Sequence, residues 1–233
     1  METTIGSRVD RLAAARHNLR DARGGRVILV AHCLLNENVR YLGGARRPGV
    51  VDEFVDAVQA SGVGICQMAC PEQRAWGGVL KRRMLLGFGA DADRPFLLRT
   101  LVAWLFVAYT RWRYDRLAAH VVAEVADYRH AGFDVVGIVG VDGSPSCGVR
   151  LTLDLDRAID ALGRCDPTTT DATAFNERVV RANVIPGQGL FTAALRRRLR
   201  RRRLRVSWFS HDLVAELDGR SGLSGALRHA LGT

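Results

Sequence analysis

Three continuous runs of apolar residues constrain the fold of this chain more than any other feature. They occupy residues 27–31, 63–69 and 134–141. Each run has the length of a strand, and none alternates with polar residues, which is typical of strands buried on both faces of a parallel sheet. A shorter run over residues 204–209 is a fourth candidate strand.

Helical patterns separate these candidate strands. One has apolar residues spaced i, i+3, i+4 and i+7 from Val51, and a second spans residues 117–128. Gly62 and Gly132 follow the two patterns and are expected to end the helices. Strands that alternate with helices predict an α/β protein. We expect a three-layer α/β/α fold with a mostly parallel sheet of about four or five strands.

The 233 residues are enough for one α/β domain. Residues 1–25 form a polar, arginine-rich helical extension, and residues 26–233 form the domain, with a helical aromatic insertion near 80–130. Within this insertion, residues 95–114 are apolar and aromatic, but their longest uncharged run, Leu101–Thr110, is too short to span a bilayer with ease, so we expect no transmembrane segment. A buried helix, a partner or membrane-surface patch, and a lid over an active site are three interpretations of this stretch.

The chain is basic, with 34 Lys and Arg residues against 24 Asp and Glu residues and a net charge of +10. Lys81 is the only lysine, so the excess is almost wholly arginine, which indicates coding bias rather than selection for phosphate contacts. Eight arginines nevertheless lie between Arg196 and Arg205. This strip is either a solvated helix face or a surface for RNA phosphates. The sequence also leaves open whether two copies of the chain form a homodimer.

The chain has five cysteines, and an odd number in a chain of this length does not predict a disulfide framework. The first 25 residues lack the apolar core of a signal peptide. We therefore expect a cytoplasmic protein with reduced thiols, which are free to bind metal.

Three of the cysteines follow the ends of three predicted strands: Cys33, Cys70 and Cys147. Because ligands bind beyond the carboxyl ends of parallel strands, we expect these thiols to meet at one edge of the sheet. Three thiolates suit a 4Fe-4S cluster and leave its fourth iron without a protein ligand. Such an iron binds a soft atom such as sulfur. A structural zinc site requires four ligands, and the usual close pairs are absent.

The other two cysteines have simpler interpretations. Cys66 lies inside the second predicted strand and is expected to be a small buried hydrophobe, and Cys165 lies in a polar segment. His32 precedes Cys33, so a nucleophilic Cys–His pair is a rival interpretation. Adjacent strand residues point to opposite faces, which disfavours that pair.

Four segments together resemble the 2-thiouracil desulfurase (TudS) family, and most closely its TudS-related branch of desulfidases. They read CLLNENVRYLGG, CPEQRAWGG, GSPSCGV and IPGQGLFTAALRRRL, and the resemblance covers about residues 26–80 and 130–205. It implies a Rossmann-like fold in which Cys33, Cys70 and Cys147 hold a 4Fe-4S cluster. It also implies removal of sulfur from a small thiolated substrate such as a nucleobase.

On this resemblance, Glu72 and Ser144 are the catalytic residues near the substrate. Hydrolysis of a C–S bond needs an acid or base, and a carboxylate two residues from a cluster ligand is placed for that role. Glu72 is alternatively a first-turn acid of a helix after Pro71, and Ser144 a turn cap. Asn36 stands where simpler desulfurases have glycine, and it bonds either the loop or the cluster.

The sequence therefore predicts an enzyme, namely an iron–sulfur-dependent, non-redox desulfidase that acts on a thiolated nucleobase or a related thioamide. The alternative is an iron–sulfur or zinc-binding sensing or interaction module without desulfidase activity.

Overall fold

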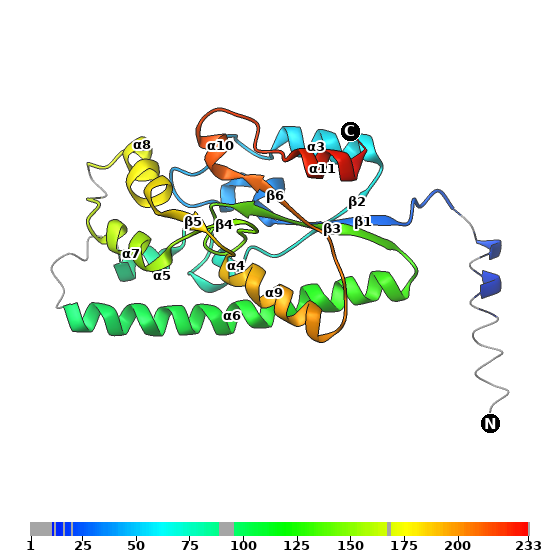
Figure 1. The fold of residues 1–233 in the computed structure, drawn as a ribbon, viewed down its shortest axis with the longest axis horizontal. Coiled ribbons are helices and arrows are strands. Elements are labelled where there is room, and N and C mark those ends of the chain that lie inside the picture. The colour runs from blue at the N-terminus through cyan, green and yellow to red at the C-terminus, as the bar shows by residue number, and fades with distance from the viewer. Residues whose placement is uncertain are drawn as a thin grey trace, which may run out of the picture.

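The structure, a computed structural model, describes residues 11, 13–15, 17–19, 21–88, 96–166 and 169–232. Its centre is a four-stranded sheet in the order β2-β1-β3-β6, in which every neighbouring pair is parallel (Figure 1). The strands are β1 (Arg26–Val30), β2 (Gly64–Gln67), β3 (Asp134–Asp142) and β6 (Trp208–Asp212). The predicted α/β class with a parallel sheet is confirmed.

Helices cover both faces of this sheet, which gives three layers (Figure 1). Helices α3 (Asp52–Ser61) and α11 (Gly225–Leu231) lie on one face, and α6 (Phe96–His130) and α9 (Leu190–Arg201) lie on the other. Strands β1 and β3 are buried on both faces, as their unbroken hydrophobicity predicts. For β2 that expectation is wrong, because this strand lies at the edge of the sheet and Gly64, Ile65 and Gln67 are exposed.

Short elements complete the chain. They are α2 (His32–Leu35), η1 (Glu37–Val39), α4 (Pro71–Ala75), α5 (Arg82–Phe88), β4 (Leu151–Leu153), α7 (Leu155–Gly163), α8 (Ala172–Phe175), the π-helical η2 (Asn176–Val180), η3 (Arg181–Asn183), β5 (Val184–Pro186) and α10 (Leu213–Leu217). Strands β4 and β5 pair with each other in a separate antiparallel sheet.

The hydrophobic core has two parts. The main cluster surrounds the sheet and includes the fully buried Ile28, Leu29 and Val30 of β1. A second, smaller cluster joins α5, α7 and η2 and contains Phe88, Ala158, Ile159, Leu162, Cys165 and Val179. The excursion of the chain between β4 and β5 therefore has apolar packing of its own beside the sheet.

The helix ends agree with the glycine signals. Gly62 has φ 65° at the C-cap of α3, and Gly132 has φ 81° two residues after α6. The fourth predicted strand differs, because β6 begins at Trp208 rather than at residue 204. After α9 the chain turns at Arg203, which has φ 55°. Its pairing with β3 begins at Trp208, opposite Ile138, so the residues before Trp208 are not part of the strand.

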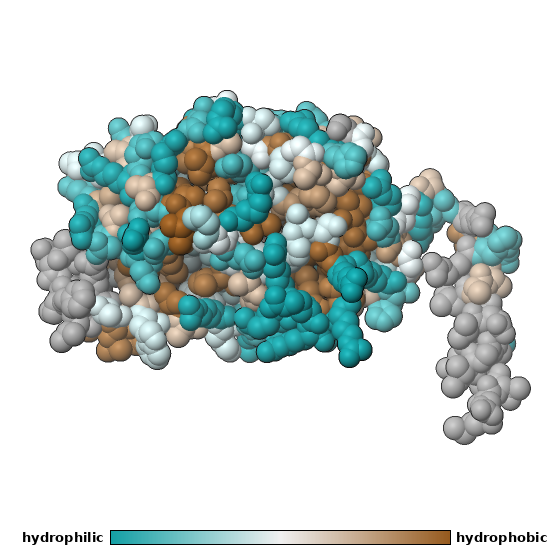
Figure 2. Space-filling model, in the orientation of Figure 1, coloured by the Kyte–Doolittle hydropathy of each residue, from teal (hydrophilic) through white to brown (hydrophobic). Residues whose placement is uncertain are grey.

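The aromatic stretch and the following helical pattern form one 35-residue helix, α6. Its N-terminal half is buried on one side only, because Trp104 is 65% and Trp112 is 52% exposed while Thr110 and Tyr114 are buried. Figure 2 shows hydrophobic residues at the surface near this end of the helix. Within the described ranges, no helix has the length and hydropathy needed to cross a membrane.

The polar extension is described only in part. Residues 1–10 lie outside the described residues, and those described between 11 and 18 are helical. The boundary between extension and domain stays a prediction.

The arginine strip forms the outer side of α9 and the turn after it, where Figure 2 shows a hydrophilic surface. Several of its arginines have partners within the chain. Arg197 and Arg198 form ion pairs with Asp115 of α6, and the Arg196 guanidinium lies 4.5 Å from the centre of the Trp208 ring. Contact with RNA stays a prediction.

Gly140 of β3 allows a test of how closely this strand packs against the loop that carries Cys147. A Cβ on Gly140 would lie 2.2 Å from the carbonyl oxygen of Cys147, whereas one on Gly225 would have no neighbour within 4 Å. We expect Gly140→Ala to lower the free energy of unfolding by about 1–3 kcal/mol or more, as overpacking does. Gly225→Ala should leave it unchanged or raise it slightly. Urea unfolding checks both, and equal stability of the two variants would contradict the described packing.

Candidate functional site

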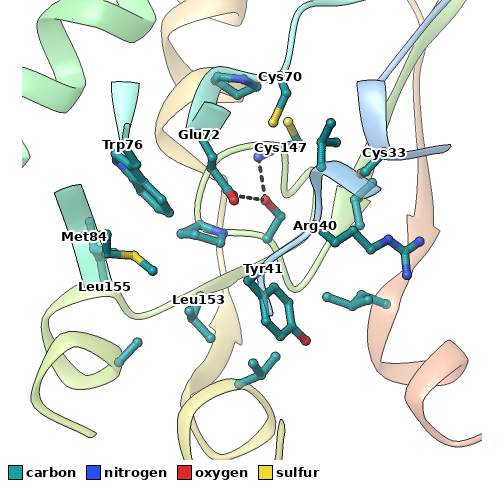
Figure 3. Close-up of a pocket in the computed structure, with 18 of the residues that line it drawn as sticks. Cys33, Arg40, Tyr41, Cys70, Glu72, Trp76, Met84, Cys147, Leu153 and Leu155 are labelled. Atoms are coloured by element: carbon teal, nitrogen blue, oxygen red, sulfur yellow. Dashed lines mark hydrogen bonds between the residues drawn. The ribbon is translucent and has the colours of Figure 1, made fainter. Parts of the chain in front are cut away.

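A pocket that opens to solvent lies at the carboxyl ends of β1, β2 and β3. All five predicted site residues line it: Cys33, Cys70, Glu72, Ser144 and Cys147 (Figure 3). The strand order places β1 between β2 and β3, so the chain leaves β1 towards one neighbour and later returns on its other side. This is the switch point at which α/β proteins bind ligands.

Each cysteine comes from a different connection. Cys33 lies in α2 directly after β1, and Cys70 is the N-cap of α4 after β2. The Cys70 Sγ accepts a hydrogen bond from the backbone N–H of Gln73 at 3.4 Å. Cys147 lies in the loop between β3 and β4. The strand ends alone therefore bring three distant thiols to one pocket.

The loop that carries Cys147 is organised by Asp142, which is fully buried at the end of β3. Its Oδ1 accepts hydrogen bonds from the N–H groups of Val149 and Arg150, both at 2.9 Å, and of Leu151 at 3.2 Å. Burial alone would raise the pKa of Asp142, but these backbone hydrogen bonds outweigh it and lower the pKa. The loop thus folds around an ionised carboxylate.

The same loop is attached to the start of α9. The N–H of Leu190 donates to the carbonyl of Pro145 at 2.8 Å, and the N–H of Phe191 donates to that of Ser146 at 3.0 Å. A Cβ at Gly189 would lie 2.4 Å from the Ser146 carbonyl group. The IPGQGLF segment therefore supports the loop and does not contribute side chains to the reaction chemistry.

The carboxylate of Glu72 is the polar centre of the pocket. Its Oε1 accepts hydrogen bonds from Ser146 Oγ at 3.0 Å and from Ser144 Oγ at 3.4 Å, of which Figure 3 shows the second as a dashed line. The Tyr114 hydroxyl lies 2.7 Å from Ser146 Oγ and is the donor of that bond, because Ser146 uses its own proton on Glu72. A buried line of hydroxyls thus leads from α6 to the carboxylate.

The geometry agrees with the simpler interpretations of Glu72 and Ser144, whereas their catalytic roles stay predictions. Glu72 does lie in the first turn of α4, after Pro71 at the helix start. Ser144 Oγ does cap a turn, because it accepts the N–H groups of Ser146 at 3.1 Å and Cys147 at 3.0 Å. Its one proton points at Glu72, so Ser144 orients the carboxylate and is not a free nucleophile.

Lys81 completes the surroundings of Glu72 and was not predicted. It is 1% exposed, its Nζ donates to the Val39 carbonyl, and the same Nζ lies 4.0 Å from Glu72 Oε2. Its backbone has φ 53°, which is rare for a residue with a side chain, and Gly77 and Gly78 before it also have positive φ. The signal in the sequence was that this is the only lysine.

A buried ion network lies behind Cys33. Arg40 lies 2.7 Å from Glu216 and 3.2 Å from Glu37, and Arg47 contacts both carboxylates. The His211 Nε2 lies 3.4 Å from Glu216 Oε2. Since Arg40 also lines the pocket, this network fixes one positive charge beside the thiols.

The three thiols are protonated at neutral pH when they have no metal. Burial raises the pKa of Cys33, and the Arg40 guanidinium opposes this only in part. Burial likewise raises the pKa of Cys70 to about 12 and that of Cys147 well above its usual value. Burial also lowers the pKa of His32, so the environment disfavours a thiolate–imidazolium pair and with it the nucleophilic Cys–His interpretation.

The donor set fits an iron–sulfur cluster. The three thiols are free of disulfides. The charge of Cys33 would raise the pKa of Cys70, and the charges of Cys33 and Cys70 would raise the pKa of Cys147. Soft, buried thiolates are the ligands that such clusters take. Over the described ranges, no three His, Cys, Asp or Glu side chains are grouped as a metal site. The cluster ligands and the zinc alternative both stay predictions.

The remaining residues singled out from the sequence lie elsewhere. Cys66 packs in the main core and Cys165 in the second cluster, and neither lines the pocket. The Asn36 Oδ1 accepts a hydrogen bond from the Asn38 N–H at 3.1 Å, so Asn36 bonds its own loop.

Fold and site define an α/β protein with a thiol-lined pocket at the switch point of its sheet. No protein-family model matches the sequence, and no curated protein matches it. A solved structure of a 4Fe-4S-dependent thiouracil desulfidase, TudS, is 19% identical, with 79% of this chain and 90% of that chain covered and a TM-score of 0.38. At that TM-score the likeness carries no inference about activity, so function is inferred below from the residues of this chain.

The buried network makes stability depend on pH. Burial alone would raise the pKa of Glu216 from its model-peptide value of 4.5, but the His211 imidazole and the Arg40 guanidinium hold it well below that value. The carboxylate therefore stabilises the fold above about pH 4.5, and this contribution is lost as the pH falls towards the folded pKa. We expect Glu216→Gln to cost about 3–5 kcal/mol at pH 7, because it removes one of the two carboxylates that pair with the buried Arg40.

Urea unfolding at several pH values measures this effect. The difference between wild type and Glu216→Gln should narrow by about 1.4 kcal/mol per pH unit below pH 4.5. Arg157→Gln is the control, since Arg157 is 73% exposed at 3.5 Å from Asp154, and it should change stability by about 0.5 kcal/mol or less. A difference that stays constant down to pH 3 would contradict the assigned charge state.

Proposed function

We propose that this protein is an iron–sulfur-dependent, non-redox desulfidase that hydrolyses a thiocarbonyl group. The observation that carries the proposal is the gathering of three free thiols and one hydrogen-bonded carboxylate in a single pocket. The resemblance of the four sequence segments to the desulfurase family supports it as well. In the overall reaction water replaces sulfur on carbon, and the sulfur leaves as hydrogen sulfide without any change in oxidation state.

In this proposal Cys33, Cys70 and Cys147 hold a 4Fe-4S cluster. When bound, the cluster supplies a Lewis-acidic iron without a protein ligand, which attracts the soft sulfur of the substrate. Arg40 places a positive charge beside the thiolate of Cys33 and so stabilises its ionised form.

Glu72 has the role of general base and then general acid. Its carboxylate takes a proton from water as the oxygen of that water bonds to the thiocarbonyl carbon. The C–S bond then breaks, and the same carboxyl returns that proton to the departing sulfur. The remaining hydroxyl proton leaves as the carbonyl forms, and it completes the hydrogen sulfide in solution. The two serine hydroxyls on Oε1 and the Lys81 ammonium near Oε2 hold the carboxylate in one orientation.

The alternative function, a sensing or interaction module with the same cluster, differs in one measurable respect. A sensor retains iron and sulfide but releases no sulfide from a thiocarbonyl compound. The deciding experiment is anaerobic purification with iron and sulfide analysis, followed by a sulfide-release assay on 2-thiouracil and thiouridines. A colourless, iron-free protein after anaerobic reconstitution would exclude both functions.

The ligand assignment predicts which cysteines are needed. We expect Cys33→Ser, Cys70→Ser and Cys147→Ser each to lose the brown colour and most of the bound iron, because a cluster held by two thiolates exchanges readily with solvent. Cys66→Ser and Cys165→Ser are the matched controls and should retain both. Loss of iron in the controls, or its retention in the first three, would refute the assignment.

The carboxylate assignment predicts a separation of cofactor binding from turnover. Glu72→Gln should keep its iron and lower the rate of sulfide release by about 10²–10⁴-fold, the usual contribution of an acid–base group. Glu124→Gln, a substitution on α6 outside the pocket, should retain the wild-type rate. Activity of Glu72→Gln close to wild type would assign the proton transfer to another group.

A further inference from the structure

The pocket continues beyond its reactive end into a region that we name the apolar lobe. It is defined by Trp76, Leu155, Ala158, Leu162, Phe175 and Val179. Ala158, Leu162 and Val179 belong to the second hydrophobic cluster, so the lobe runs from the cysteines towards the packing between α7 and η2. In Figure 3 the thiols lie on one side of the pocket, and Trp76, Met84, Leu153 and Leu155 lie on the other.

The aromatic residues near the lobe have polar atoms that are already engaged elsewhere. The Trp76 Nε1–H donates to Thr110 Oγ1 at 3.0 Å, and the Tyr41 hydroxyl donates to Asn176 Oδ1 at 2.6 Å. Their rings therefore present hydrophobic surface to the pocket and no hydrogen-bonding group. A ligand that enters this region gains from burial of apolar surface and not from polar contacts.

Charged groups are confined to the reactive end. Arg40 is held by Glu37 and Glu216, and Lys81 by the Val39 carbonyl beside Glu72. None of the six residues that define the lobe, all of them described, carries a charge. A phosphate placed there would lose its hydration without gaining a cation, which is unfavourable.

One wall of the lobe has an unusual backbone. Val179 belongs to η2, a π-helical segment of five residues, and π-helical turns are frequent at functional sites. Asn176 ties this segment to the other side of the pocket, because its Oδ1 accepts from Tyr41 and its Nδ2 donates to the Gly43 carbonyl at 2.9 Å. These contacts keep the wall at a fixed distance from the loop after η1.

We propose that the natural substrate is a thiocarbonyl compound with an apolar alkyl or aryl body, and not a nucleotide or thiolated RNA. The reacting thioamide lies at the thiols and Glu72, and the body lies in the apolar lobe. The identity of the reacting group rests on the proposed function, whereas the preference for an apolar body rests on the lobe alone.

Binding of oxygen analogues tests the preference without turnover. Uracil, 6-propyluracil, 6-benzyluracil and uridine 5′-monophosphate are titrated calorimetrically into the anaerobically prepared, iron-loaded protein. Each buried methylene contributes about a fourfold gain in affinity, so 6-propyluracil should bind at least about tenfold more tightly than uracil. Equal affinities of the three uracils, or tightest binding of the nucleotide, would overturn the proposal.

Substitutions in the lobe locate the effect. Ala158→Phe fills the lobe and should remove the advantage of 6-benzyluracil while the affinity for uracil changes less than about twofold. Ala161→Phe is the control, because this residue lies on the same helix outside the pocket. Val179→Thr, which keeps the shape of the side chain but adds a hydroxyl, should lower the affinity for 6-benzyluracil several-fold. Equal losses in Ala158→Phe and Ala161→Phe would contradict the placement.

Sulfide release from the matching 2-thio compounds distinguishes this inference from the proposed function. Tight binding of 6-benzyluracil without sulfide release from any thio compound would support the apolar lobe as a binding region. It would contradict the proposed desulfidase activity. Sulfide release at equal kcat/KM from 2-thiouracil and its 6-benzyl derivative supports the activity and overturns the apolar substrate.

Discussion

The buried carboxylate of Asp142 is the interaction on which the site depends. Three backbone N–H groups of the following loop converge on it, at the carboxyl end of the strand that lies between β1 and β6. The residues between Asp142 and those N–H groups include Ser144, Ser146 and Cys147. One charge, withdrawn from water and satisfied by backbone donors, therefore places a thiol and two hydroxyls at once.

Hydrogen bonds then extend from that loop in two directions. Towards α9, its carbonyl groups accept the first N–H groups of the helix and leave no room for side chains at Gly189. Towards α4, its hydroxyls reach Glu72, whose helix begins at Cys70. Loop, helix start and carboxylate are thus positioned together, and a shift in any of them would change the distance between the thiols and the carboxyl.

The sequence allowed prediction of the parallel sheet and of the edge at which Cys33, Cys70 and Cys147 meet. Both follow from local patterns, namely unbroken apolar runs and cysteines directly after them. It did not allow prediction of Tyr114 and Lys81 as neighbours of Glu72. Tyr114 lies within a 35-residue helix, and Lys81 follows a turn with positive φ angles. Their positions depend on tertiary packing, which the spacing of apolar residues in the sequence does not reveal. The Arg40 network was missed for the same reason, because Glu37 and Glu216 are far apart in the chain.

The burial of Lys81 gives the protein a chemical reporter of its own. With a single lysine in the sequence, and that one 1% exposed, an amine-directed reagent meets no other ε-amino group. The extent of acylation at Lys81 therefore measures the fraction of molecules in which the turn between α4 and α5 has opened. A ligand seated against Glu72 slows that acylation, so the rate of labelling reads out occupancy of the pocket without any spectroscopic probe.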